Sequence, residues 1–179
     1  MRAHPASARI ELRLRELAQL FNSMDPSPFI DRDLDTEAEG FIASWARESH
    51  GTTEFELVVH LTTPPSPEAA AGAQSAVQHY FASRVELKQR EFRQLLRRGR
   101  TSLIVGVLFL TACLILGEVI GHGRGSVASI IKESLTIGGW VAMWRPLEIY
   151  LYDWWPLREE IRLLERLSRL RVSLQLPQP

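Results

Sequence analysis

An arginine and a glutamate lie in one of the two most apolar parts of the chain. Arg145 and Glu148 flank Pro146 within residues 135–155, where most other side chains are aliphatic or aromatic. A spacing of three places both charges on one face of a helix, where they can pair. Charges at membrane depth are costly and usually face water or a bundle interior. Three interpretations remain open: an interfacial pair in which Arg145 reaches the headgroups, a gating or transport role, and a contact with a partner helix.

A stripe of arginines follows this segment at helical spacing. Its members are Arg158, Arg162, Arg166 and Arg169, and the opposite face of the same helix carries Leu157, Ile161, Leu164 and Leu167. This pattern predicts an amphipathic helix that lies on the cytoplasmic leaflet, with the arginines in contact with anionic lipid. Packing of the helix on a soluble domain is the alternative. The helix lacks exposed aromatic residues and is interrupted by glutamates, so we expect no nucleic acid partner.

An acidic loop is the remaining cluster of chemically active side chains. It contains Asp25, Asp31, Asp33 and Asp35. The spacing does not match an EF-hand, so the favoured interpretation is a solvated loop or one that faces the basic helix of residues 84–100. The histidines are His4, His50, His60, His79 and His122, and they do not have the spacing of metal ligands. The sequence therefore predicts no catalytic, cofactor-binding or metal-binding residue, no cofactor and no enzymatic activity.

The apolar residues of the chain are concentrated between residues 101 and 155. Acidic and basic residues balance at 21 each in 179 residues, but they are segregated. Residues 25–39 hold six acids and one arginine, whereas residues 84–100 hold seven bases and two acids. The single cysteine excludes an intramolecular disulfide. The N-terminus lacks the apolar region of a secretory signal.

The first half of the chain predicts a small α/β domain. Residues 1–8 are expected to be a flexible tail. Alternation of apolar and polar residues predicts a strand at about 9–15, followed by a short helical turn, with a helix over this stretch as the alternative. A helix from about 36 to 49, capped by Asp35 or Thr36, and a strand over 54–62 follow. No strong break follows residue 68, so we expect the helix of residues 68–98 to lead almost continuously into the first membrane span. The order β-α-β-α predicts a parallel pair of strands within a cytoplasmic domain at 9–98. Because a two-stranded sheet is thin, we expect it to dock on the long helix or to dimerise.

The second half predicts a transmembrane α-helical hairpin. Residues 101–120 match a membrane span in length and carry one charge. We assign 121–133 to an outer turn, 134–155 to the second span and 156–179 to a cytoplasmic amphipathic helix and tail. A second span at about 126–145 is the alternative. Lysine and arginine are concentrated before the first span and after the second, which predicts that both termini are cytoplasmic.

Small residues recur on both predicted spans. They are Cys113, Gly117, Gly121, Gly138 and Ala142. Small residues allow helices to approach closely in a bilayer. The sequence leaves open whether they pack the two spans together or join subunits of a homo-oligomer.

Several segments together resemble a family of small, uncharacterised bacterial two-span inner-membrane proteins. They are Asp25-Pro-Ser-Pro-Phe29, Asp31-Arg-Asp-Leu-Asp35, the run from Gly139 to Glu148, and Leu151-Tyr-Asp-Trp-Trp-Pro156. The resemblance extends from Ile10 to Leu170. It implies a bacterial inner-membrane location and no particular activity or site.

The sequence favours a membrane scaffold or adaptor whose cytoplasmic domain recruits a protein partner. An oligomeric channel or transport accessory using Arg145 and Glu148 is the second hypothesis. A metal-dependent membrane enzyme using the acidic loop is the third. The partners expected for the first hypothesis are the lipid bilayer, further copies of the chain and an unknown protein.

Overall fold

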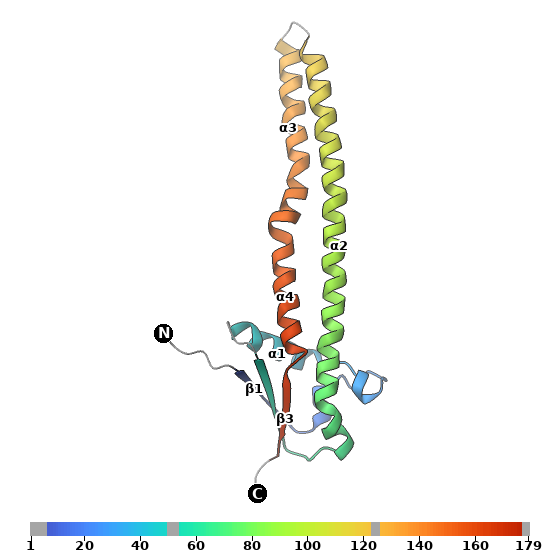
Figure 1. Ribbon diagram of the computed structural model, residues 1–179, viewed down its shortest axis with the longest axis vertical. Helices are drawn as coiled ribbons and strands as arrows, with labels where there is room; N and C mark the ends of the chain where they lie inside the picture. The colour runs from blue at the N-terminus through green and yellow to red at the C-terminus, as the bar shows by residue number, and fades with distance from the viewer. Residues whose placement is uncertain (1–6, 50–53, 123–125, 177–179) are drawn as a thin grey trace, which may run out of the picture. The chain divides into compact units, whose positions relative to one another are not determined.

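The computed structural model describes residues 7–49, 54–122 and 126–176. The chain is mostly helical and forms two compact units (Figure 1). One unit contains Met1–Lys88 and Glu159–Pro179, and the other contains Gln89–Arg158. The prediction of a tail at residues 1–8 is wrong for its last two residues, because strand β1 already begins at Ser7. Residues 1–6, His4 among them, and His50 lie outside the described part of the chain.

A three-stranded parallel sheet forms the centre of the first unit. Its strands are β1 (Ser7–Leu14), β2 (Glu54–Leu61) and β3 (Arg171–Gln175), in the order β1-β2-β3. The predicted parallel pairing of the first two strands is confirmed. The assignment of residues 156–179 to a helix and tail is wrong at its end, where β3 pairs with β2. Five residues after an arginine-rich helix are too few for the alternation of apolar and polar side chains to predict a strand. Only the pairing with β2 identifies this segment as β3.

Each strand buries alternate side chains on one face of the sheet. On β2 these are Phe55, Leu57, Val59 and Leu61, all nearly inaccessible to solvent. The other strands add Ile10 and the partly buried Ala8, Leu12, Leu14, Val172 and Leu174. The period of two places these core side chains on one face of the sheet, although Val58 on the other face of β2 is also buried.

Helices from three parts of the chain complete this core. Helix α1 (Thr36–Glu48) begins at Asp35, whose side chain accepts hydrogen bonds from the N–H groups of Glu37 and Ala38. Ile42 of α1 and Phe81 of α2 are fully buried in the same cluster. The predicted turn after the first strand is present as a short 3₁₀ helix, η1 (Leu17–Leu20), and η2 (Phe29–Asp31) lies in the loop before α1.

Helix α4 (Trp154–Leu167) corrects the prediction of a leaflet-bound amphipathic helix. Its apolar residues Leu163, Leu164 and Leu167 belong to the core of the first unit, together with Leu170. An apolar face that is already packed against protein has no free surface to insert into lipid. The alternative, packing on the soluble domain, is therefore the arrangement observed.

Helix α2 (Pro67–Gly121) is continuous from the first unit into the second, as expected from the absence of a strong break. The predicted outer turn at 121–133 is wrong from Ser126 onward, because α3 (Ser126–Glu148) begins there. Residues 123–125 lie outside the described part. A π-helical turn, η3 (Ile149–Asp153), joins α3 to α4, so the predicted second span is not one regular helix.

Glycines bring α2 and α3 into close contact within the second unit (Figure 1). A Cβ added at Gly139 would lie 2.7 Å from Leu110, and one at Gly106 would lie 3.3 Å from the carbonyl oxygen of Ala142. Pro146 lacks the N–H that would bond this carbonyl in a regular helix. Gly106 therefore allows α2 to approach α3 at the position where Pro146 interrupts its hydrogen bonding.

One described helix, α2, contains a stretch long and apolar enough to cross a membrane. Only 17% of that stretch is buried. A buried core helix of a soluble protein would have most of this surface covered.

Candidate functional site: the open face of the sheet

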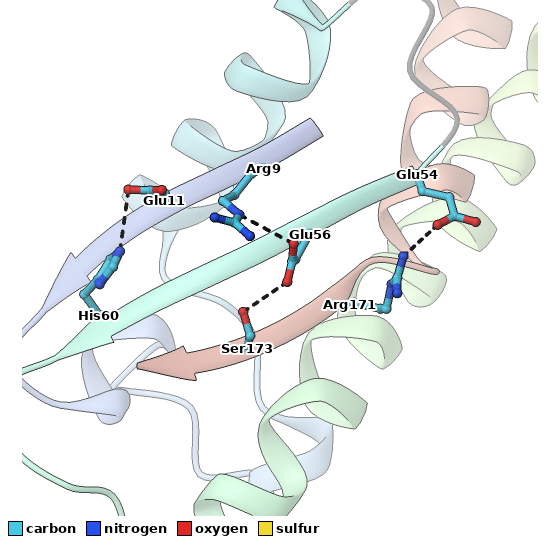
Figure 2. A network of polar contacts seen from close by, with 7 residues as sticks. All are labelled: Arg9, Glu11, Glu54, Glu56, His60, Arg171 and Ser173. Carbon is cyan, nitrogen blue, oxygen red and sulfur yellow. Dashed lines mark hydrogen bonds and ion pairs between the residues drawn. The ribbon is translucent and has the colours of Figure 1, made fainter. Parts of the chain in front are cut away.

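The second face of the sheet is largely polar, with Val58 as its one apolar strand residue within the described part of the chain. The side chains that alternate with the core residues are Arg9, Glu11, Arg13, Glu54, Glu56, Val58, His60, Arg171, Ser173 and Gln175. We call this surface the open face. Figure 2 shows seven of these residues projecting from the three strands. The register places them in rows that cross the sheet, such as Arg9, Glu56 and Arg171.

Ion pairs and hydrogen bonds connect neighbouring strands on the open face (Figure 2). The Glu56 carboxylate lies 3.5 Å from Arg9 Nε and accepts a hydrogen bond of the same length from Ser173 Oγ. Arg171 donates to Glu54 over 2.8 Å. These contacts connect β2 to both of its neighbours and match opposite charges across the ladder. They are partly or largely solvent-exposed, so each adds at most about 1 kcal/mol of stability.

His60 has a different environment from the other charged groups of the open face. Its Nε2 atom is buried, lies 3.5 Å from Glu11 Oε2, and has no hydrogen-bond partner in the described residues. Val58, in the middle of the face, is only 1% exposed although it lies outside the main core cluster. The open face therefore combines inter-strand ion pairs with a buried side chain, Val58, at its middle.

A separate polar cluster links α1 to α2 inside the first unit. The Tyr80 hydroxyl donates to Glu39 Oε2 over 2.7 Å, and Arg84 Nε donates to Glu39 Oε1 over 3.0 Å. Burial raises the pKa of Tyr80 above its ordinary value, and the Glu39 carboxylate raises it further. Tyr80 therefore stays a protonated donor at physiological pH, and this cluster has a structural role.

The predicted lipid-contacting arginines occupy two environments. Arg158 lies in the second unit, with its guanidinium 5.7 Å from the ring centre of Trp154. The other three line a hollow of about 920 Å³ in the first unit, beside Glu54, Phe55, Glu159, Glu165 and Arg171. Arg166 lies over the ring of Phe55 at 5.6 Å. Three glutamates in the lining give this hollow mixed charge.

The predicted pair Arg145 and Glu148 is formed, and a third charge joins it. Arg145 Nη1 lies 3.0 Å from Glu148 Oε2 and 3.6 Å from Asp153 Oδ2. The Arg145 side chain is 64% exposed in the chain. Asp153 comes close because η3 adds a wider turn after α3. The sequence reasoning missed this third member, since a regular helix would not have suggested it.

The predicted packing residues fall on different sides of the helix pair. Cys113 is buried next to Gly139, and Gly117 and Gly121 lie against Lys132. The carbonyl of Ala142 faces Gly106, whereas Gly138 has no neighbour within 4 Å of an added Cβ. Lys132 also forms an ion pair with Glu118, which the sequence reasoning did not anticipate.

The acidic loop is organised by backbone hydrogen bonds. Asp25 accepts from the N–H groups of Asp33 and Ser27, which holds the pKa of its carboxyl below the ordinary value. Asp35 caps α1, and Asp31 lies 3.4 Å from His79 Nε2. Within residues 7–49, 54–122 and 126–176, no three potential metal-ligating side chains gather in one place.

Comparisons with known proteins identified no match among protein families, curated proteins or solved structures.

Proposed function

We propose that this protein is a non-enzymatic membrane adaptor: a helical hairpin anchors it, and the open face of its α/β unit binds a protein partner. The observation that carries the proposal is the pairing of β2 with β3. These strands lie on opposite sides of the apolar helices in the sequence, so one folded unit contains both ends of the hairpin.

The exposed apolar surface supports a membrane location. Large side chains exposed on α2 include Leu108, Phe109 and Ile115, and those on α3 include Trp140, Val141 and Trp144. Such contiguous apolar surface on two neighbouring helices is unfavourable in water and favourable in a bilayer.

The topology of the first unit supports two spans. Because β2 and β3 pair, the chain that leaves this unit through α2 must return to the same side of a membrane through α4. An even number of crossings follows if α2 crosses once. In this proposal α3 provides the second span, in place of the regular helix predicted at 134–155.

Contacts of α2 with α3 and with η3 support a register for the second span. Gly121 lies against Lys132 and Gly99 lies against Ile149. A first span at 101–120 is therefore opposite residues of about 132–149. In this register Lys132 is at the outer boundary, and Arg145 and Glu148 are near the inner boundary. This supports the interfacial interpretation of the charge pair.

The distribution of lysine and arginine supports cytoplasmic termini. Seven bases lie in residues 84–100, and a further group follows Arg158, whereas the connection between the helices is poor in them. The resemblance to small bacterial two-span proteins adds the inner membrane as the location. A multi-pass inner-membrane protein with both ends in the cytoplasm is thus part of the proposal.

A homo-oligomer is compatible with the uncovered faces of the helix pair. On α3, a Cβ added at Gly138 would meet no atom within 4 Å, and Trp144 is largely exposed. A second copy of the chain could pack against this part of α3. The exposed Arg145 also favours an oligomeric channel or transport accessory as the second candidate, because a charge on this surface would then face other subunits.

Site-specific labelling tests the anchor. In a Cys113→Ser background, we expect a membrane-impermeant maleimide to label His122→Cys in intact cells, and Ser44→Cys or Gln175→Cys only after permeabilisation. Opposite accessibility of Ser44→Cys and Gln175→Cys would refute the hairpin, as would recovery of the protein in the soluble fraction.

Photo-crosslinking tests the adaptor role in the same membranes. A photoreactive residue at Ser173, on the open face, should give one dominant adduct with a partner protein, whereas the same residue at Ser83 on α2 should not. Loss of that adduct in a Glu56→Lys, Arg9→Glu variant that still folds would assign the open face. Equal adduct patterns from both positions would contradict the assignment.

A further inference from the structure

The carboxyl ends of the three parallel strands enclose a second cavity. It has a volume of about 460 Å³ and is lined by Arg13, Leu14, Arg15, His60, Leu61, Thr62, Gln175 and Leu176. We call it the strand-end pocket. Ligands of open α/β sheets bind most often outside the carboxyl ends of the strands. A volume of this size suits a small molecule.

Strand register brings the polar lining residues together. Arg13 is the partner of His60 on β2, and His60 is the partner of Gln175 on β3. Pairing continues past the end of β1, because the N–H of Thr63 donates to the carbonyl of Arg15 over 2.9 Å. The side chains of Arg13, Arg15 and His60 therefore line one pocket although they come from two strands.

Charge distinguishes this pocket from the rest of the open face. Glu54, Glu56 and Glu11 each lie at ion-pair distance from Arg171, Arg9 and His60, respectively. Within the described residues, Arg13 and Arg15 form no ion pair, and no carboxylate lines the pocket. The larger hollow beside α4 has three glutamates in its lining. The strand-end pocket thus differs from this hollow in that two arginines line it and no carboxylate does.

We propose that the strand-end pocket binds the phosphate group of a small, soluble phosphorylated ligand. Guanidinium groups match phosphate oxygens with two parallel hydrogen bonds. The hydroxyl of Thr62 and the amide of Gln175 supply further donors at the rim, and Leu14, Leu61 and Leu176 offer apolar surface to the remainder of the ligand. The larger charge of a phosphate suits two arginines better than a single carboxylate does.

Calorimetry with the full-length protein in zwitterionic nanodiscs tests this site, with pyrophosphate as the probe. We expect saturable binding that weakens at least about tenfold in Arg13→Gln, Arg15→Gln, because charge-assisted hydrogen bonds are lost. Arg9→Gln is the matched control, since Arg9 is on the same strand and face but pairs with Glu56. This control should change affinity by less than about twofold.

The result that overturns the proposal is absence of saturable binding, or equal loss in the control and the double variant, when circular dichroism shows that all proteins are folded. A second arm repeats the titration in nanodiscs with phosphatidic acid. If the natural ligand is soluble, the affinity for pyrophosphate should be the same in these nanodiscs. A weaker affinity would show that the lipid headgroup competes for the pocket, and it would overturn the proposal of a soluble ligand. Neither measurement depends on the membrane topology or on the protein partner, so failure here is distinguishable from failure of the proposed function.

Discussion

Asp25 illustrates how a residue that looks like a metal ligand can serve the fold. Its carboxylate accepts backbone hydrogen bonds from Ser27 and Asp33, and so it closes the loop that leads into α1. Aspartate is favoured in such turns because its side chain satisfies nearby N–H groups. Acidic composition alone did not separate this role from cation binding, whereas the hydrogen-bond geometry accounts for Asp25 and, as a helix cap, for Asp35.

The loop predicts a defined pH dependence of stability. The pKa of Asp25 is lowered in the folded protein, so its stabilising contribution is present above the ordinary pKa of about 4 and is lost as pH falls through the folded value. We expect the difference in free energy of unfolding between wild type and Asp25→Ala to be constant near neutral pH and to shrink in acid. Denaturant unfolding at a series of pH values measures it. A difference that grows on acidification would contradict the assignment.

At the scale of the elements, the close packing of α3 on α2 depends on which of two adjacent glycines of α3 faces α2. Gly139 lies against Leu110 and Cys113, whereas the adjacent Gly138 has open space around it. Small-residue content marked this part of the chain for helix packing and named Gly138 as a candidate, but it did not determine which glycine faces α2. The structure assigns the internal contact to Gly139.

Leucine substitutions at these two glycines provide a matched test. Gly139→Leu should destabilise the helix pair by about 1–3 kcal/mol or more, because the added side chain meets Leu110 and the backbone behind it. Gly138→Leu should leave the monomer nearly unchanged. Thermal unfolding in detergent measures both. Equal losses would show that the packing of α2 on α3 differs from the one described.

The first unit joins segments from opposite ends of the sequence. Leu167 and Leu170 follow the apolar helices in sequence, yet they are fully buried with Ile10, Leu57 and Phe81. Stability of the N-terminal strand therefore depends on residues near the C-terminus. This arrangement explains how an otherwise thin two-stranded sheet acquires a third strand and a sufficient core.

Truncation of one C-terminal core side chain tests this dependence. Leu167→Ala should lower the free energy of unfolding by about 2–5 kcal/mol and speed amide hydrogen exchange in β1. Leu176→Ala is the control, since Leu176 is 51% exposed. Exchange in β1 that is unaffected by Leu167→Ala would mean that the N-terminal segment folds independently.

Local patterns in the sequence determined the elements that carry their own signal. Alternation at about 9–15 and the apolar run at 54–62 predicted two strands, and the β-α-β order predicted that they pair in parallel. The long apolar run predicted a helix suited to a membrane. The resemblance to a family of small membrane proteins and the location of the termini stay predictions. These local patterns report which face of a segment is apolar, which is a property of a few neighbouring residues.

Only the tertiary structure decided which surfaces meet. The apolar face of α4 fits a lipid leaflet and a protein core equally well by composition, and the core of the first unit takes it. Residues 171–175 become a strand because the edge of β2 is available, and this pairing brings Arg13, His60 and Gln175 into one row. Contacts between distant segments depend on the competition among all available faces and edges, and no local period encodes that competition.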